Sequence, residues 1–133
     1  MNGRTVRVYS KAKCGAQAVS EHFKVREFAC KDGSDVVFIS MELVEILQKI
    51  RNHFGLPVTI NSGYRTPAYN KKVDGAAYSQ HLYGTAADIT VRGVSPQRVA
   101  DFAETLLEHT GGIGRYAAFT HIDVRDEKAR WKG

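Results

Sequence analysis

Apolar residues recur at helical spacing over residues 40–54. The apolar positions lie three and four apart, on one face of a helix: Leu43, Ile46, Leu47, Ile50 and Phe54. Ser40 can cap such a helix at its start, and Gly55 followed by Pro57 ends it. The pattern therefore predicts a helix over residues 40–54.

A second long helix is expected over residues 96–108. Ser95 supplies a capping side chain, and Pro96 suits the first turn. The apolar stripe consists of Val99, Phe102, Ala103, Leu106 and Leu107. Two shorter segments also have helical signals: residues 66–72 are expected to form a short helix, and residues 25–28 a single helical turn.

β-Branched and alternating residues predict several extended segments. They are residues 4–9, 58–62, 86–91, 113–116 and 119–124. A short turn separates the last two, so we expect them to pair as a hairpin. Small and polar residues predict loops over residues 10–18 and 31–35.

These elements predict an α+β fold with a small, mainly antiparallel sheet. The two long helices are expected to cover one face of the sheet, which leaves a cleft on the other face. With 133 residues, 43% of them apolar, the chain is expected to be one domain over 1–133, with an N-terminal arm over 1–19 and a core over 20–131. The tail from residue 126 is charged apart from Trp131, which we expect to pack on the domain.

The chain is moderately basic, with a formal net charge of +5. This charge favours anionic partners, either nucleic acid or the phosphate and carboxylate polymers of a bacterial wall. The Lys and Arg residues are scattered, however, so a solvated surface accounts for the charge and no nucleic-acid partner is expected. Cys14 and Cys30 lack the spacing of a zinc-binding pair, and we expect them to be structural or free thiols.

No stretch of the sequence approaches the about 18 apolar residues that a membrane span needs. Residues 1–8 also lack the apolar segment of a signal peptide, so synthesis in the cytoplasm is expected. A substrate outside the membrane would then be reached by another route, such as phage or prophage lysis or incorporation into a virion.

Two segments far apart in the chain contain groups that bind zinc. Neutral imidazole and carboxylate are typical ligands, and a catalytic zinc site uses three of them and leaves a fourth position for water. His81, Asp88 and His121 form such a trio, and Gly84 lets the chain bend between the first two. Alternation along a strand would place His121 and Asp123 on the same face. The sequence therefore predicts a zinc site.

A longer pattern surrounds this trio: Ser79-x-His81-x-x-Gly84-x-Ala86-x-Asp88, followed by a late His121. The pattern resembles that of the zinc D-alanyl-D-alanine carboxypeptidase family. This group includes D,D-dipeptidases of vancomycin resistance and phage endolysins that cut cell-wall peptides, and the hedgehog signalling domain has a related fold.

The resemblance covers about residues 20–131. Residues 23–34, the expected helix over 40–54 and residues 62–66 fall in the order expected of the family's peptidoglycan-directed members. The resemblance implies a hedgehog-like or D,D-peptidase-like arrangement of the sheet and helices.

Residue by residue, the resemblance implies that His81, Asp88 and His121 are the three zinc ligands. Zinc in such a site polarises the scissile carbonyl and lowers the pKa of its water to about 7. Arg65 matches an arginine that in the family faces the substrate and its developing oxyanion, and a guanidinium can bind either group with paired donors. Ser79 is expected to contact the substrate or, alternatively, to hold the turn before His81.

The general base is the point at which this sequence departs from the family. Several members have an acidic residue a few positions before the last histidine, but residues 115–120 contain no carboxylate. Asp123 is the nearest candidate, because it shares a face with His121 and could accept a proton from the zinc-bound water. Its alternative role is to orient a ligand histidine through the other ring nitrogen. Asp74 and Glu21 are further candidates, for which surface solvation is the alternative.

The site and the resemblance together imply a monomeric zinc metallopeptidase that acts on the stem peptide of bacterial peptidoglycan. We expect it to hydrolyse peptide bonds of D-amino acids, as a D,D-carboxypeptidase or as an endopeptidase on cross-links. Zinc-bound water would attack, Arg65 would stabilise the developing charge, and Asp123 would carry the proton to the leaving amine. The alternative is a zinc-containing wall-binding or structural module that has lost catalysis, because the upstream carboxylate is missing.

Overall fold

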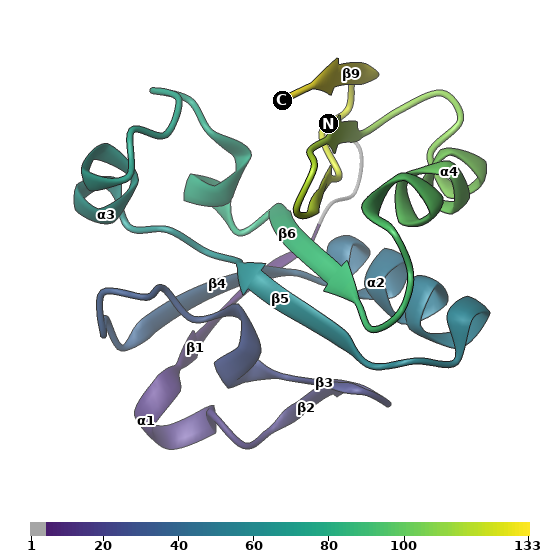
Figure 1. The fold of residues 1–133 in the computed structure, drawn as a ribbon. Coiled ribbons are helices and arrows are strands. Elements are labelled where there is room, and N and C mark those ends of the chain that lie inside the picture. The colour runs from purple at the N-terminus through teal and green to yellow at the C-terminus, as the bar shows by residue number, and fades with distance from the viewer. Residues whose placement is uncertain (1–4) are drawn as a thin grey trace.

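The computed structural model describes residues 5–133, which form three small sheets and several helices (Figure 1). The strands are Val6–Ser10 (β1), Ala18–Ser20 (β2), Phe23–Lys24 (β3), Val36–Ser40 (β4), Val58–Ser62 (β5), Ala86–Val91 (β6), Gly112–Arg115 (β7), Thr120–Asp123 (β8) and Ala129–Lys132 (β9). The helices are Lys11–Cys14 (α1), Met41–Phe54 (α2), Pro67–Lys72 (α3) and Pro96–Leu106 (α4), with 3₁₀ turns at Val25–Phe28 (η1) and Gln80–Tyr83 (η2).

The largest sheet has five strands in the order β5-β6-β8-β7-β9. All neighbours pair antiparallel except β7 and β9, which pair parallel. The two long helices, α2 and α4, contact each other; α2 packs on β6, and α4 packs on β6, β7 and β8 (Figure 1). This arrangement confirms the predicted α+β fold, with a mainly antiparallel sheet that has helices on one face.

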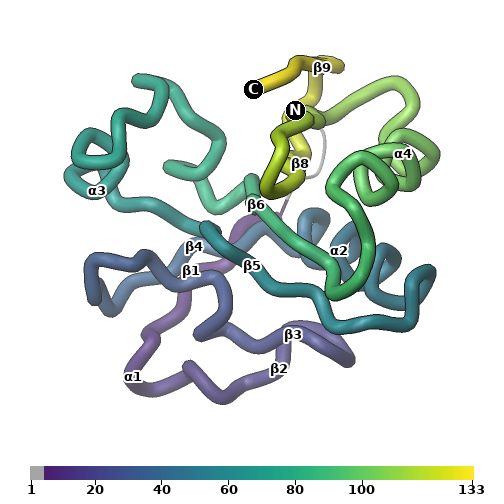
Figure 2. The backbone as a smooth tube through the Cα atoms, viewed as in Figure 1, coloured from purple at the N-terminus to yellow at the C-terminus, as the bar shows by residue number. Residues whose placement is uncertain are grey.

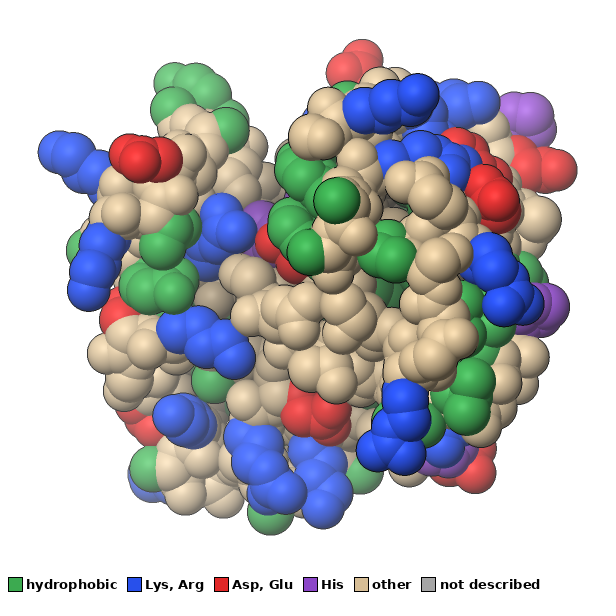
Figure 3. Space-filling view, viewed as in Figure 1, with side chains coloured by type: hydrophobic (Ala, Val, Ile, Leu, Met, Phe, Trp, Pro, Cys, Tyr) green, Lys and Arg blue, Asp and Glu red, His purple; other side chains and the backbone are tan. Residues whose placement is uncertain are grey.

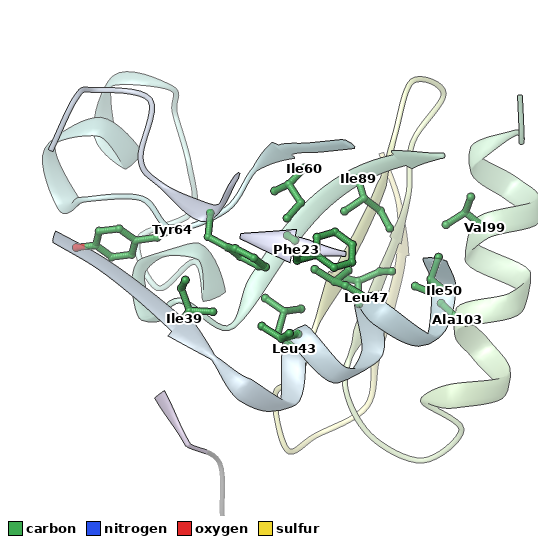
Figure 4. Packing of buried hydrophobic residues seen from close by; sticks show 14 of the residues in the cluster. Phe23, Ile39, Leu43, Leu47, Ile50, Ile60, Tyr64, Ile89, Val99 and Ala103 are labelled. Carbon is green, nitrogen blue, oxygen red and sulfur yellow. The ribbon is translucent and has the colours of Figure 1, made fainter. Parts of the chain in front are cut away.

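The core lies between this sheet and the two helices (Figure 4). Alternate residues of β5, β6, β7 and β8 point into it, and these side chains are almost completely buried: Ile60, Ile89, Ile113 and Ile122. The helices contribute Leu43, Leu47, Ile50, Val99 and Ala103. Full burial of one such aliphatic side chain stabilises the fold by about 1.5–3 kcal/mol. The apolar side of each strand is therefore held against the core, and its other side stays open.

The N-terminal part of the chain forms a further layer, drawn below the main sheet in Figure 2, and it contributes Phe23, Phe28 and Ile39 to the same core. β1 and β4 pair antiparallel along their whole length, and β2 pairs with β3. The predicted loop over residues 10–18 is wrong in its first part, where α1 forms. The Ser10 side chain caps that helix by accepting the Lys13 N–H, and Asp35 accepts the N–H of Ala12.

The other predicted elements lie within a few residues of their expected positions. Helix α2 ends at Phe54 as expected, whereas α4 ends at Leu106, two residues early, because Leu107 leaves the helical conformation. Four strands went unpredicted, β2, β3, β4 and β9, and the charged tail therefore includes a sheet strand. The two cysteines are free thiols, as expected. Among residues 5–133, no helix combines the length and the apolar character that a bilayer crossing requires.

Candidate metal centre

The predicted ligands come together on the open face of the main sheet. Asp88 on β6 pairs directly with His121 on β8, so both side chains project from the face opposite the helices. His81 comes from η2, whose first N–H groups Ser79 caps through its hydroxyl. All three side chains are buried: the exposed fractions are 3% for His81 and 8% for Asp88 and His121.

The geometry of these three side chains fits a metal ion. Asp88 Oδ1 lies 2.9 Å from His121 Nδ1 and 3.3 Å from His81 Nε2. Each of the three residues offers one ligand atom, and these three atoms lie within 4.8 Å of one another. Two imidazoles and one carboxylate that converge in this way are a typical donor set for zinc.

Hydrogen bonds fix the orientation of both histidines. His81 Nδ1 lies 2.7 Å from the Gly63 carbonyl and donates to it, which leaves Nε2 directed toward Asp88. His121 Nε2 lies 2.8 Å from Asp123 Oδ2, which leaves Nδ1 directed toward Asp88. Outer hydrogen bonds of this kind set the tautomer and the ring plane of ligating histidines.

Asp123 is completely buried, and both its carboxylate oxygens are engaged. Oδ2 accepts hydrogen bonds from His121 Nε2 and from Arg125 Nη2 at 2.7 Å, and Oδ1 accepts from Arg125 Nε at 2.9 Å and from the Arg125 N–H at 3.1 Å. Burial alone would raise the pKa of Asp123, but the hydrogen bonds from His121 and Arg125 outweigh burial and hold that pKa well below its ordinary value. Asp123 is therefore an ionised carboxylate that faces His121 and not the cleft.

The same balance of burial and hydrogen bonding governs the other titratable groups. Burial raises the pKa of Asp88, but hydrogen bonds from His121 and His81 outweigh it and hold the pKa well below the ordinary range. Burial lowers the pKa of His121, yet its bonds to Asp123 and Asp88 raise that pKa above the ordinary value of 6.5. In the metal-free protein, the protonated form of the His121 ring is therefore favoured by its two carboxylate neighbours.

Arg65 lies beside His81, Asp88 and His121 in the same cleft. Its guanidinium donates to Ser62 Oγ and Asn70 Oδ1, both at 3.2 Å, and approaches Asp88 Oδ2 at 3.5 Å. Ser79 also lines the cleft, and its hydroxyl accepts the His81 N–H at 3.2 Å. The structure thus brings both predicted substrate-binding residues to the site and gives Ser79 the turn-holding contact.

The cleft around these residues has a volume of about 510 Å³. Figure 3 shows it as a notch between two lobes, with charged side chains at its base and hydrophobic side chains along its right-hand side. Its remaining lining includes Asp74 on the loop after α3, and Tyr116, Phe119, Arg125 and Trp131 on the opposite side. Glu21 lies in the turn between β2 and β3 and does not line the cleft.

Three glycines leave space for the side chains of the site. Of these, only Gly84 was expected to have a role, as a bend between His81 and Asp88. Gly84 has a positive φ of 73°, and a Cβ there would lie 2.3 Å from the Phe38 carbonyl oxygen. A Cβ on Gly112 would lie 2.2 Å from Asp123 Oδ2, and one on Gly114 would lie 2.6 Å from the Trp131 indole. The spacing Gly-x-Gly within a strand was the available signal, because it leaves one face without side chains.

Comparison with known proteins agrees with the geometry. The family model of peptidase M15 matches residues 18–123. The zinc D-Ala-D-Ala carboxypeptidase of Streptomyces albus G is 38% identical over 64 residues, which cover 47% of this chain and 24% of that protein. The match thus spans about a quarter of the curated relative. Because the family model covers most of the chain, including His81, Asp88 and His121, the chain belongs to the peptidase M15 family.

Proposed function

We propose that this protein is a zinc metallopeptidase that hydrolyses D-amino-acid peptide bonds in bacterial peptidoglycan, as a D,D-carboxypeptidase or an endopeptidase. The observation that carries the proposal is the convergence of His81, Asp88 and His121 at the base of an open cleft. Membership of peptidase M15 and the similarity to a zinc D-Ala-D-Ala carboxypeptidase support the reaction class.

In this proposal, His81 Nε2, Asp88 and His121 Nδ1 hold the zinc ion. When bound, zinc supplies Lewis acidity that polarises the scissile carbonyl and activates the attacking water. Asp88 stays ionised throughout the working pH range, since its pKa is depressed. The Gly63 carbonyl keeps His81 in the tautomer that presents an unprotonated Nε2.

Arg65 stabilises negative charge on the reacting carbonyl. Three of its five N–H donors are directed to Ser62, Asn70 and Asp88. These contacts hold the guanidinium in a single orientation while its other donors remain for a substrate oxygen. Ser79 acts chiefly by holding the η2 turn that presents His81.

Asp123 acts on His121 and not on the substrate. Its oxygens accept four hydrogen bonds from His121 and Arg125, and it lies outside the cleft lining. Of the two roles expected for this residue, the contacts support orientation of a ligand histidine over proton transfer. Asp123 is thus a positioning residue in this proposal.

Mass spectrometry of muropeptides after incubation with the zinc-loaded protein tests the activity. We expect loss of terminal D-alanine, or cleavage of cross-links, by the wild type and by the surface variant Glu127→Gln, but not by His81→Ala. Glu127 is exposed and lies outside the cleft, so this variant controls for purification and handling. Absence of product from the zinc-loaded wild type would overturn the proposal.

A second function has its own test, because both oxygens of Asp123, the carboxylate bonded to His121 Nε2, are already held by His121 and Arg125. A zinc-containing module that binds the wall without hydrolysis would have this arrangement. Such a module would sediment with insoluble peptidoglycan while muropeptide release stays at the level of His81→Ala.

The proposed partner is the peptidoglycan stem peptide, and the net charge of +5 favours approach to anionic wall polymers. Deployment during phage or prophage lysis, or in a virion, is consistent with this target. Binding to peptidoglycan that weakens as ionic strength rises would support the electrostatic contribution. Binding that is insensitive to salt would contradict it.

A further inference from the structure

Three aromatic residues form one side of the cleft, and we call them the aromatic wall: Tyr116, Phe119 and Trp131. Tyr116 and Phe119 stack with ring centroids 4.4 Å apart and an angle of 13° between the planes. The Trp131 indole N–H donates to the Tyr116 hydroxyl at 2.9 Å, and its ring centroid lies 5.0 Å from that of His121. The aromatic wall is therefore a connected unit that borders the metal ligands.

The main sheet leaves space for the aromatic wall at Gly114. Trp131 on β9 pairs in register with Gly114 on β7, and Gly114 pairs with His121 on the next strand. Because Gly114 has no side chain, the indole lies directly over the β7 backbone; a Cβ there would come within 2.6 Å of it. The indole thus stays beside His121, at the surface of the cleft.

The wall is uncharged although Arg125 adjoins it. The Arg125 guanidinium lies 5.3 Å from the Trp131 ring, but two of its nitrogens are paired with the Asp123 carboxylate at 2.7–2.9 Å. That pair neutralises the arginine charge on this side of the site. Arg65 lies on the other side of the metal ligands, so the cleft has a cationic side and a neutral aromatic side.

The wall retains one hydrogen-bond donor. The Tyr116 oxygen accepts the indole N–H, so its own hydrogen is free to point elsewhere. Within residues 5–133, no acceptor for that hydrogen lies within hydrogen-bond distance. A hydroxyl that already accepts a hydrogen bond is polarised toward donating one.

We propose that the aromatic wall is a peptide-binding subsite, an inference that rests on the proposed function. The penultimate residue of a peptide that ends in D-Ala-D-Ala lies against Trp131 and Phe119, and the carbonyl of the residue before it accepts the Tyr116 hydroxyl. The scissile carbonyl, which belongs to the penultimate residue, then lies toward Arg65. Small neutral side chains fit this wall, whereas an acidic side chain would lose its hydration without gaining a cation.

Calorimetric titration of the metal-free protein with an N-acetylated tripeptide ending in D-Ala-D-Ala tests the subsite without turnover. We expect Tyr116→Phe to weaken binding by about 5–10-fold, the loss of one neutral hydrogen bond. A matched tripeptide ending in D-Glu-D-Ala should bind the wild type about tenfold more weakly than the D-Ala-D-Ala peptide. Trp131 is the single tryptophan of the chain, so its fluorescence should change on saturation.

Tyr83→Phe is the matched control, because Tyr83 is 47% exposed and lies outside the cleft. This variant should bind like the wild type. Melting temperatures of both variants separate a binding role from a structural one: a wall that only anchors β9 would lower the melting temperature of Tyr116→Phe and leave the affinity unchanged. That result, or absence of binding to the wild type, would overturn the subsite.

The muropeptide assay keeps the two proposals distinguishable. Binding that depends on Tyr116 without any hydrolysis would retain the subsite and overturn the peptidase. Hydrolysis together with binding that Tyr116→Phe leaves unchanged would retain the peptidase and overturn the subsite.

Discussion

The two faces of the five-stranded sheet are built from the same strands but by opposite means. On the covered face, Ile89, Ile113 and Ile122 are at most 1% exposed and fill the space beneath α2 and α4. On the open face, the alternate positions of β6 and β8 hold Asp88 and His121. Because successive side chains of a strand point to opposite faces, a core residue directly follows a residue of the site: Ile89 follows Asp88, and Ile122 follows His121.

Glycine is the second difference between the faces. On the covered face, every central strand contributes a large side chain, as close packing requires. On the open face, β7 contributes only Gly112 and Gly114, whose missing side chains leave space for Asp123 and Trp131. The open face is therefore assembled by removing side chains from one strand so that polar and aromatic groups of its neighbours can lie across it.

The largest expected effect is loss of the metal on the open face. His81→Ala removes one of three ligands, so zinc affinity should fall by more than the about 100-fold that loss of an outer hydrogen bond costs. Metal analysis after gel filtration should find stoichiometric zinc in the wild type and none in the variant. His109→Ala is the control, because the His109 side chain is 90% exposed, and it should retain zinc. Equal zinc in both variants would contradict the assigned ligand set.

The covered face should respond in stability. Ile122→Ala leaves a cavity between the sheet and the helices, and we expect the free energy of unfolding to fall by about 2–5 kcal/mol. Urea unfolding measures the loss, and Val8→Ala, at an exposed position, should change stability by less than about 0.5 kcal/mol. Zinc affinity of the folded Ile122→Ala protein should stay close to the wild-type value. A large drop would mean that the two faces are coupled.

Asp123→Asn tests the open face alone, because it changes the residue that holds His121 and leaves the core untouched. An amide cannot match the carboxylate in holding the His121 ring, so we expect zinc affinity to fall by about 10–100-fold, as measured by competition with a chelator. The pH profile of kcat/KM for zinc-saturated protein supplies the second measurement. Loss of its acidic limb with unchanged zinc affinity would show instead that Asp123 transfers protons.

The smallest expected effect is a pH dependence confined to the open face. The pKa of His121 is raised in the folded, metal-free protein, so its contribution to stability is complete below pH 6.5 and is lost as pH rises through the folded pKa. The melting temperature of the metal-free wild type should therefore fall more between pH 6 and pH 9 than that of His121→Gln. Identical pH profiles would contradict this assignment. Zinc binds only the unprotonated His121 ring, so added zinc should raise the melting temperature more at pH 9 than at pH 6.

Local patterns in the sequence sufficed for the two long helices and for two strands of the main sheet. The apolar periodicity of α2 and α4 and the β-branched runs of β5 and β6 depend on neighbouring residues, and the structure confirms all four elements. His81 and Asp88 could be grouped for the same reason, since they lie within one short segment, whereas their approach to His121 depends on the pairing of β6 with β8.

Features that depend on distant pairing were missed. β9 becomes a strand only because β7 offers an edge, and α1 forms because Asp35, from another segment, helps to cap it. The burial of Asp123 follows from the side chain of Arg125 folding back and from the absence of a side chain at Gly112. β4 is different, because the apolar run over residues 36–39 was a local signal that could have predicted it.

Gly84 joins the N-terminal layer to the turn that carries His81. Its carbonyl accepts the Ser40 N–H at 2.9 Å, and its bare Cα lets the η2 turn rest against the Phe38 carbonyl. Ser40 is also the residue that caps α2. Three elements thus meet at this point of the fold: the start of α2, the end of β4 and the η2 turn that carries His81. Damage to the paired strands β1 and β4 should therefore be detectable as weaker zinc binding, even though none of their residues lines the cleft.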